Sequence, residues 1–361
     1  MTTSRTSRAC IVVGGGDAPG VNAVIRGFVH AAMRRGIDVM GCHDGFEGLL
    51  APNGIRPLGV ADVRGILPRG GCALGCSTRV NPFFVPQGEG KEPANMGSEV
   101  ITRLRGLRID ALVLVGGDGT MHAAKGFAAL GMPSVGIAKT IDSDVEGADV
   151  TVGFDTAVAA ATHAIDALHS TAEAHARVMV VEVMGRHAGW LALQSGIAGG
   201  ADVILLPELP YQLDRVIAKI REREAAGLRF SIVAISEGAR PVEGDLAFIE
   251  PPRPGHLARL GGAGQRLADA LDRSNLGHEV RLTVLGHLQR GGTPTAFDRM
   301  LGTRLGVHAA EMCALGAFGH MATFKEGRIT SVPFDDVKNR CVDLDGSLVA
   351  AARDLGLELG A

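Results

Sequence analysis

Aspartates stand in two neighbouring stretches whose other residues are mostly glycine or small and polar. Asp118 lies in GGDGT, residues 116–120, whereas Asp142 and Asp144 lie in TIDSD, residues 140–144. An aspartate on a glycine turn, with no lysine or arginine adjacent in sequence, suits a hydrated Mg²⁺ ion held against phosphates. A second carboxylate can take a proton from an alcohol. Together the two stretches indicate phosphoryl transfer, whereas either one alone is equally typical of a turn or a helix cap.

A glycine-rich stretch near the start of the chain is a third feature that suits phosphate. GGGDAPG, residues 14–20, follows an apolar run and leads into a helical pattern over 22–35. A glycine loop that opens a helix presents backbone N–H groups to an anion. The stretch is not the dinucleotide fingerprint GxGxxG, because Asp17 stands at its third position when the count starts at Gly15. Read in isolation, it could be a plain turn.

Two arginines close to glycines extend the set of candidate phosphate ligands. Arg79 follows the glycine-containing segment 69–76, and Arg186 follows Gly185 after another apolar run. A lone arginine on a loop is usually only solvated. A guanidinium can nevertheless form a fork of hydrogen bonds with a phosphate, so both residues are candidates.

Short apolar runs predict the strands that must position these residues. The runs lie at 9–13, 38–42, 111–115, 135–137, 177–183, 202–206, 230–235 and 281–285, and helical patterns cover 22–35, 99–107, 153–169, 191–200, 213–224 and 263–271. This alternation over 361 residues predicts an α/β protein of two lobes, with ligands at the carboxyl ends of the strands. The proline-rich stretch 241–254 is expected to be an exposed loop.

The composition argues against several classes of protein. Lys plus Arg number 36 and Asp plus Glu number 39, so the net charge of -3 gives no reason to expect a nucleic-acid partner. Six scattered cysteines fit reduced cytoplasmic thiols, and Cys72 and Cys76 lack the second Cys or His pair that a zinc site needs, so both are interpreted as small core or loop residues. No apolar run approaches the ~20 residues of a membrane span, and we expect a soluble cytoplasmic protein without a membrane partner.

Seven motifs follow one another between about Cys10 and Arg304, a span that covers most of the chain. They read GGGDAPGVNAVIRG, GGDGT, KTIDSD, VGFDTAV, VEVMGRHAGW, SEG and LGHLQRGG. In this combination and order they resemble the phosphofructokinases, the 6-phosphofructokinases that use ATP or pyrophosphate. The resemblance implies two Rossmann-like three-layer lobes with mainly parallel sheets and an active site in the cleft between them. It implies a phosphoryl-donor and magnesium lobe at 1–152 plus about 289–336, and a sugar-phosphate lobe at 153–288 plus about 337–361.

The resemblance also implies roles for residues at matching motif positions. Asp142 resembles the general base that takes the proton from the 1-hydroxyl of the sugar, with Thr140 and Asp144 beside it. Asp118 resembles the carboxylate that holds Mg²⁺, and Arg186 the cation that meets the charge developing on the phosphoryl group. The implied donor-site residues are Gly15, Gly16, Arg79, Val80, Gly117, Asp118, Gly119, Thr120 and Lys139, of which Gly15 is also implied to be catalytic.

Fructose 6-phosphate is the substrate that the resemblance implies. Its implied contacts are Met184, Gly185 and Glu237 to the ring, His287 and Arg290 to the 6-phosphate, and Thr140, Asp142, Asp144 and Arg186 at the reacting end. Arg177 and Arg281 resemble arginines that family members extend to the 6-phosphate site of a neighbouring subunit. A dimer is therefore the minimum and a homotetramer the expected assembly. From the residues alone, a salt bridge at a strand start remains an alternative role for these two arginines.

Two residues point to different phosphoryl donors. In the family a glycine after GGD leaves room for a nucleotide, so Gly119 favours ATP. A lysine before TID accompanies pyrophosphate, so Lys139 favours pyrophosphate or an ATP-dependent subclass that carries both residues. Gly119 carries more weight, because a carboxylate at 119 would block the α-phosphate, whereas a lysine side chain can swing aside. ATP is thus the expected donor. The alternative is a reversible pyrophosphate enzyme that could also accept sedoheptulose 7-phosphate.

Other kinase families share one of these motifs, and this chain differs from the phosphofructokinase pattern at some positions. NAD kinases and lipid kinases also carry GGDGT, but they lack TIDSD and GHLQRGG. Ala138 and Ser143 replace a proline and an asparagine that are common in the family. His30 stands where regulated bacterial members have an effector-binding arginine, so control by ADP or phosphoenolpyruvate is not expected.

Overall fold

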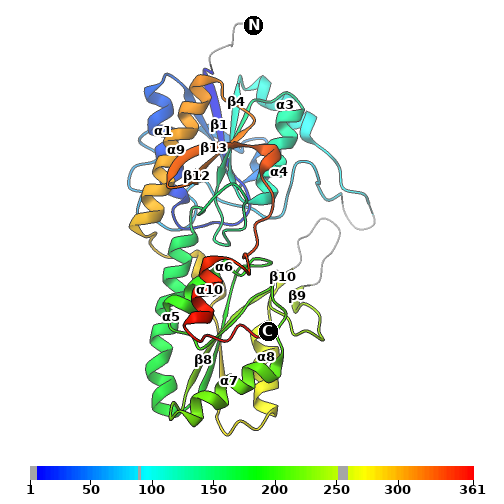
Figure 1. The fold of residues 1–361 in the computed structure, drawn as a ribbon. Coiled ribbons are helices and arrows are strands. Elements are labelled where there is room, and N and C mark those ends of the chain that lie inside the picture. The colour runs from blue at the N-terminus through cyan, green and yellow to red at the C-terminus, as the bar shows by residue number, and fades with distance from the viewer. Residues whose placement is uncertain (1–5, 88–90, 251–258) are drawn as a thin grey trace. The chain divides into compact units, whose positions relative to one another are not determined.

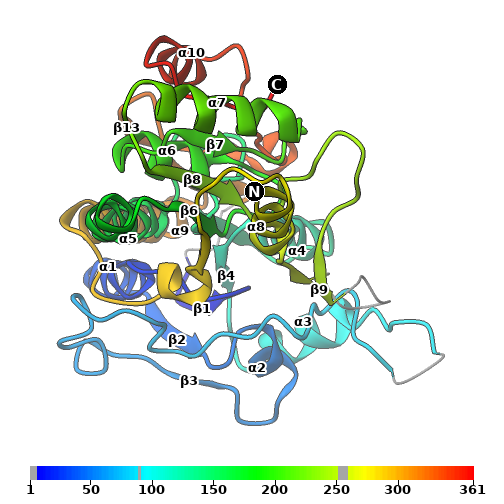
Figure 2. The same ribbon diagram turned by 90° about the horizontal axis from the view of Figure 1, so that it is seen from below.

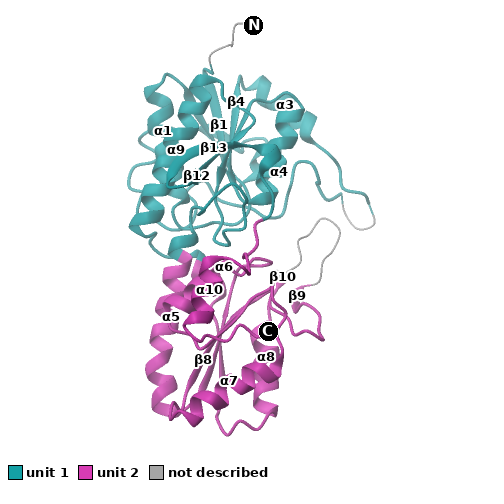
Figure 3. Cartoon of the chain, in the orientation of Figure 1, with its two compact units in different colours: residues 1–156, 290–339 teal, residues 157–289, 340–361 magenta. Residues whose placement is uncertain are grey.

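The computed structural model describes residues 6–87, 91–250 and 259–361. The chain forms two compact units, residues 1–156 with 290–339 and residues 157–289 with 340–361 (Figure 3). We call them unit 1 and unit 2. Within the described ranges, no helix has both the length and the apolar composition that crossing a bilayer requires.

Unit 1 contains a seven-stranded sheet in the order β13-β12-β5-β4-β1-β2-β3. Its strands are β1 (Arg8–Val13), β2 (Asp38–Cys42), β3 (Ile55–Pro57), β4 (Ala111–Gly116), β5 (Ser134–Ala138), β12 (His320–Lys325) and β13 (Arg328–Pro333). The five strands from β12 to β2 run parallel, and only the edge strands β3 and β13 are antiparallel to their neighbours. All six residues of β4 are buried, as its unbroken apolar sequence predicts.

The direction of the strand connections reverses between β1 and β4, which are neighbours at the centre of this sheet (Figure 1). The strand after β1 is β2, on one side, whereas the strand after β4 is β5, on the other. Open α/β sheets bind ligands outside the carboxyl ends of the strands at such a switch point. The glycine loop 14–20 and the GGDGT stretch leave these two strand ends.

Helices cover both faces of the unit 1 sheet. They are α1 (Val21–Arg34), α2 (Phe46–Leu50), α3 (Gly97–Gly106), α4 (Asp118–Ala129), α9 (Ala296–Leu315) and the short η2 (Phe334–Asp336). The helices α1 and α9 lie side by side on one face, and α3 and α4 on the other (Figures 1 and 2). A Cβ atom at Gly302 of α9 would lie 2.7 Å from the carbonyl oxygen of Gly20, so the backbones approach as closely as only glycine allows.

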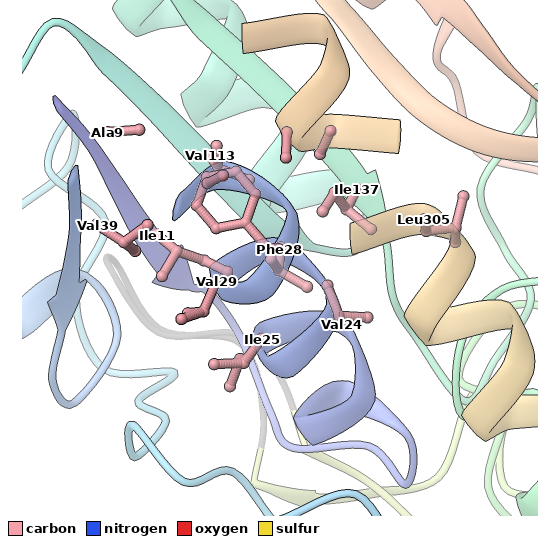
Figure 4. Packing of buried hydrophobic residues seen from close by; sticks show 14 of the residues in the cluster. Ala9, Ile11, Val24, Ile25, Phe28, Val29, Val39, Val113, Ile137 and Leu305 are labelled. Carbon is pink, nitrogen blue, oxygen red and sulfur yellow. The ribbon is translucent and has the colours of Figure 1, made fainter. Parts of the chain in front are cut away.

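The core under α1 fixes the three central strands relative to one another (Figure 4). Ile11, Val113 and Ile137 project from β1, β4 and β5, and Phe28 of α1 and Leu305 of α9 pack over them. All five side chains are fully buried. Burying one such side chain stabilises a fold by roughly 1.5–3 kcal/mol. The loops at the ends of these strands therefore start from a rigid base.

Unit 2 contains a parallel four-stranded sheet in the order β11-β6-β8-β7. Its strands are β6 (Val178–Val183), β7 (Val203–Leu205), β8 (Ser231–Ser236) and β11 (Val280–Val284), with a separate antiparallel pair β9 (Phe248–Glu250) and β10 (Arg259–Leu260). Its helices are α5 (Phe154–His175), which begins in unit 1, α6 (Trp190–Ala198), α7 (Leu213–Ala225), α8 (Ala263–Arg273), the short η1 (Gly286–Arg290) and α10 (Ser347–Asp354). Both units are thus helix-sheet-helix layers on mainly parallel sheets, which confirms the predicted α/β class.

Two predicted segments differ from the structure. The helix predicted over 153–169 continues to His175, because no glycine or proline interrupts its last turns. The stretch 241–254, predicted to be an exposed loop, contains the short exposed strand β9, and its residues 251–254 lie outside the described residues.

Candidate active site

Three loops meet at the carboxyl ends of β1, β4 and β5 in unit 1. The N–H of Gly14 donates to the carbonyl oxygen of Val115 at 2.9 Å, and the N–H of Lys139 donates to that of Gly116 at 3.0 Å. A Cβ atom at Gly117 would lie 3.6 Å from the Cβ atom of Thr140. The GGDGT stretch is therefore in contact with the two loops on either side of it. The loops that carry Asp118 and Asp142 are neighbours, as the sequence predicts.

Thr120 packs between two of these loops. Its side chain is only 4% exposed, and its Oγ1 atom would lie 2.5 Å from a Cβ atom at Gly14. A Cβ atom at Gly116 would also overlap it. Glycine at both positions is therefore required by Thr120, which holds the loops after β1 and β4 together.

Lys139 is buried beneath the first glycine loop. Its side chain is 3% exposed, and its Nζ atom donates to the carbonyl oxygens of Gly14, at 3.1 Å, and Gly16. Burial lowers the pKa of the Lys139 ammonium, and the guanidinium of Arg290 lowers it further, whereas Cys76 opposes both. The expectation that this lysine can swing aside is wrong, because two loop carbonyls and the surrounding core hold it in place.

The two cations under the glycine loop orient its peptide groups. Arg290 donates from Nη1 to the carbonyl oxygen of Asp17 at 3.1 Å, beside the carbonyls that Lys139 holds. In a trans peptide the C=O of one residue and the N–H of the next point in opposite directions. The N–H groups of Gly15, Asp17 and Ala18 therefore point away from the cations. This is the orientation that a loop needs to offer N–H groups to a phosphate.

Asp118 is the first residue of α4, and its side chain is 27% exposed. His122, one turn later, has its Nδ1 atom 3.0 Å from Oδ1 of Asp118, but its hydrogen bond is with the Asp118 carbonyl oxygen at 3.2 Å. Within the described part of the chain, Oδ1 of Asp118 is buried and has no hydrogen-bond partner. Sequence analysis missed His122, although a spacing of four residues in a helix could have revealed it.

A carboxylate oxygen without a hydrogen-bond partner fits a hard divalent cation. Among the described residues, no three His, Cys, Asp or Glu side chains gather into a metal-binding group. A metal at Asp118 would thus take most of its ligands from phosphate and water. Mg²⁺ commonly binds in this way, through one or two carboxylates plus substrate phosphates.

Asp142 is held in a rigid loop. Its side chain is 4% exposed, and its N–H donates to Oγ1 of Thr140 at 3.1 Å. The hydroxyl of Thr151 donates to the carbonyl oxygen of Thr140 at 2.6 Å. Asp144, two residues further along, is partly buried. The loop thus places one buried and one partly buried carboxylate at the end of β5.

Ser143, between these aspartates, has a left-handed backbone with φ of 53°. This conformation costs an L-residue roughly 1–2 kcal/mol, a cost that glycine escapes. We expect Ser143→Gly to be about 1 kcal/mol more stable towards urea than Ser143→Ala, since both variants lack the hydroxyl and differ only in the Cβ atom. An alanine variant of equal or greater stability would show that the loop relaxes out of this conformation.

In unit 2, the loops after β6 and β8 are in contact. The N–H of Arg186 donates to Oε1 of Glu237 at 3.1 Å, and Arg186 itself has a left-handed backbone with φ of 51°. Strained backbone of this kind concentrates at functional sites. Met184 is partly buried in the same loop, and His287 is exposed in η1, after β11. The MGR and SEG motifs thus form one structure at the carboxyl edge of this sheet.

Arg177 and Arg281 lie at the opposite, amino-terminal edge of the same sheet, just before β6 and at the second residue of β11. Glu279 bridges them. Its Oε2 atom lies 2.5 Å from Nε of Arg177, and its Oε1 atom pairs with Nη2 of Arg281. Within unit 2, these arginines do not share an edge with Arg186 and Glu237.

The remaining predicted donor residues are exposed or partly exposed in unit 1. Arg79 is exposed and Val80 partly buried, and the N–H of Arg79 donates to Oγ of Ser77 at 3.2 Å. Gly119 is exposed in the first turn of α4, and a Cβ atom there would meet nothing within 4 Å.

Sequence analysis missed two buried carboxylates that each hold the N-terminus of a helix. Asp298 is fully buried and accepts hydrogen bonds from the N–H groups of Gly153 and Thr156, both at 2.8 Å, at the start of α5. Burial raises the pKa of its carboxyl group, although these donors act in the opposite direction. In unit 2, Glu182 of β6 accepts from the N–H of Gly264 at 2.7 Å, at the start of α8. Both carboxylates fix a helix N-terminus, where negative charge is favourable.

Comparisons with known proteins identify the family. Residues 8–313 match the family model described as Phosphofructokinase. A Chloroflexus aggregans protein named ATP-dependent 6-phosphofructokinase is 45% identical over 360 residues, or 99% of each chain. A Streptomyces coelicolor protein named pyrophosphate–fructose 6-phosphate 1-phosphotransferase is 45% identical over 342 residues, 94% of this chain and 96% of that protein. The solved phosphofructokinase structure from Saccharomyces cerevisiae has a TM-score of 0.77 at 30% identity, covering 97% of this chain and 47% of that chain. The chain therefore belongs to the phosphofructokinase family of enzymes.

Proposed function

We propose that this enzyme transfers the γ-phosphoryl group of ATP to the 1-hydroxyl of fructose 6-phosphate, giving fructose 1,6-bisphosphate in cytoplasmic glycolysis. The observation that carries the proposal is the meeting of the three loops after β1, β4 and β5, with Asp118 and Asp142 on two of them. Phosphoryl transfer needs a positioned carboxylate, a metal and donors to phosphate in one place. The ATP-dependent name of the Chloroflexus aggregans relative supports the choice of donor.

In this proposal Asp142 takes the proton from the 1-hydroxyl as that oxygen attacks. Its side chain is buried, and hydrogen bonds within the Thr140 loop hold the backbone that carries the carboxylate. The N–H groups around Gly15 and Gly16 bind the transferring phosphoryl group, with Arg79 and Arg186 as cations against its charge. Asp144 lies near the metal and the sugar. Mg²⁺ held at Asp118 would supply charge neutralisation to the donor phosphates when bound.

Unit 2 is proposed to supply most of the ligands of the sugar phosphate, with Arg290 of unit 1 as a further one. Met184, Gly185 and Glu237 contact the ring, and His287 with Arg290 binds the 6-phosphate. Arg177 and Arg281 lie at the sheet edge opposite to Arg186. This position supports a role in the site of a second subunit, as part of a homodimer or homotetramer. A phosphate there would compete with Glu279, which now holds both guanidinium groups.

Two observations on the donor site support ATP. Gly119 is exposed, and a Cβ atom there would meet nothing within 4 Å, so no neighbouring side chain keeps a nucleotide phosphate away from it. Lys139, the residue that favours pyrophosphate, is engaged by the carbonyls of Gly14 and Gly16. We therefore infer that Lys139 holds the glycine loop in place, and that its presence does not argue against ATP as the donor.

The second candidate is a pyrophosphate-dependent enzyme that works reversibly and also accepts sedoheptulose 7-phosphate. The Streptomyces coelicolor relative with a pyrophosphate-dependent name is 45% identical to this chain, the same value as for the ATP-dependent one. The overall sequence identity therefore does not distinguish an ATP-dependent enzyme from a pyrophosphate-dependent one. A direct assay does: purified protein with fructose 6-phosphate and Mg²⁺ receives ATP or pyrophosphate in separate reactions. Turnover with pyrophosphate alone would overturn the proposed donor.

Gly119→Asp tests the role of the open space at the start of α4. We expect the KM for ATP to rise by about 10- to 100-fold, because a carboxylate would repel the donor phosphates and occupy their space. The matched control is Gly119→Ala, whose Cβ atom meets nothing within 4 Å and whose helix propensity is better than that of glycine. Equal KM values in the two variants would show that ATP does not approach Gly119.

A further inference from the structure

Cys72 and Cys76 form a close pair that the proposed reaction does not use. The N–H of Gly75 donates to the carbonyl oxygen of Cys72 at 3.0 Å, so residues 72–75 form a turn that brings Cys76 back towards Cys72. The pKa of each thiol responds to the other, so the two thiols lie close together. Both residues are partly buried, and neither is in a disulfide. The two thiols are thus neighbours that no disulfide links.

The turn that carries the pair is fixed to neighbouring elements of unit 1. The N–H of Ala73 donates to Oδ1 of Asn22 in α1 at 2.8 Å. The carbonyl oxygen of Leu74 accepts from the N–H of Asp44, also at 2.8 Å. These bonds hold the two central residues of the turn, so the closeness of Cys72 and Cys76 is part of the folded structure.

The charges around the pair distinguish its two members. The neighbouring Cys72 thiol lowers the pKa of the Cys76 thiol, and Lys139 and Arg290 lower it further, against the effects of burial and of Asp17. The neighbouring Cys76 thiol and burial raise the pKa of the Cys72 thiol. Cys76 therefore carries the more reactive sulfur, since the thiolate is the nucleophile. Cys72 keeps its proton and stands next to it.

We propose that Cys72 and Cys76 are a reversible redox pair that hydrogen peroxide closes into a disulfide. The Cys76 thiolate attacks one peroxide oxygen, the O–O bond breaks, and the departing hydroxide takes a proton to become water. The product is a sulfenic acid on Cys76. The Cys72 sulfur then attacks the Cys76 sulfur and loses its proton, and the sulfenic oxygen leaves as a second water. Two thiols are thus oxidised by two electrons, which reduce one peroxide to two waters.

Three of the other cysteines lack the features that make this pair reactive. Cys10, Cys42 and Cys313 are buried and carry no second thiol in a turn. Burial raises the pKa of the Cys10 thiol, and it raises those of Cys42 and Cys313 to about 12. Only a small thiolate fraction is therefore available at these positions. Cys341 is exposed and serves as an internal reference.

The test uses the full reduced chain and one tryptic peptide. The peptide 70–79 follows Arg69, ends at Arg79 and contains both cysteines. After equimolar hydrogen peroxide and then iodoacetamide, we expect this peptide without alkylation and lighter by two hydrogens. If dithiothreitol precedes iodoacetamide, the doubly alkylated peptide should return in full. Two results would overturn the proposal. In the first, peptide 70–79 stays doubly alkylated after peroxide. In the second, the peptide gains oxygen that dithiothreitol does not remove.

Two serine variants test the assignment of the attacking sulfur. In Cys72→Ser we expect a sulfenic acid on Cys76 that dimedone traps faster than any product on Cys341. In Cys76→Ser we expect Cys72 to remain a thiol under the same exposure. Equal peroxide reactivity of Cys72 and Cys76 in the two variants contradicts the proposed asymmetry. Since every readout is a peptide mass, the result does not depend on whether the enzyme uses ATP or pyrophosphate.

Discussion

Asp142→Asn is expected to lower kcat for phosphoryl transfer to fructose 6-phosphate by ~10²–10⁴, the usual effect of losing a general base. Asparagine has the volume of aspartate, so the buried site and the hydrogen bond from the residue 142 N–H to Thr140 should persist. Sugar binding should therefore change little. Steady-state kinetics give kcat, and equilibrium binding of fructose 6-phosphate without donor gives the affinity.

The control for this variant is the same chemical change at Asp166, an exposed residue of α5. Asp166→Asn should leave both kcat and sugar affinity within experimental scatter of the unaltered enzyme. If Asp142→Asn also turns over at the rate of the unaltered enzyme, another group takes the proton. If its loss of kcat is matched by a loss of sugar binding, Asp142 acts in binding instead.

Asp298→Asn is expected to lower the free energy of unfolding by about 2–4 kcal/mol. Both carboxylate oxygens accept hydrogen bonds at the start of α5, from the N–H of Gly153 and from the N–H and hydroxyl of Thr156. Asparagine offers only one oxygen, so at least one buried N–H loses its acceptor and faces the new NH₂ group instead. Each buried group left unsatisfied costs about 1–3 kcal/mol. Urea unfolding followed by circular dichroism measures the change.

Asp166→Asn again provides the reference, because a surface substitution away from specific contacts usually changes stability by less than about 0.5 kcal/mol. A second variant, Thr295→Ala, removes the hydroxyl that accepts from the N–H of Asp298 at the start of α9. Loss of such a helix cap costs about 1 kcal/mol. Asp298→Asn should therefore be the more harmful of the two. The reverse order would show that the carboxylate contributes little to the fold.

The strands and loops of the candidate site were predictable from sequence because their signals are local. The unbroken apolar run of β4 predicts a buried strand, and the glycines that follow it predict the turn. Placement at neighbouring strand ends follows from the rules of parallel sheets. The contact between Gly117 and Thr140 is the result of that rule, although the two residues are far from adjacent in sequence.

Contacts over long sequence distances were not predictable. Nothing near Lys139 in the sequence shows that its ammonium group reaches the carbonyl of Gly14, 125 residues away. Asp298 lies three residues after Thr295, a spacing typical of a capping box, but its partners Gly153 and Thr156 are more than 140 residues distant. The helix α9 was missed because its glycines, such as Gly302, weaken the helical signal. They are present because α1 must approach closely.

Unit 1 is made of two segments that are separated in the sequence by most of unit 2, and this affects how it folds during synthesis. The strand β12 pairs with β5, but residue 320 follows residue 138 by 182 positions, most of which form unit 2. At about 5–20 residues per second, a ribosome needs roughly 10–40 s to cover that interval. During this time the emerging chain has an unpaired β5 edge and no α9 to cover α1. Nascent unit 1 should therefore depend on chaperones, whereas most of unit 2 can form first.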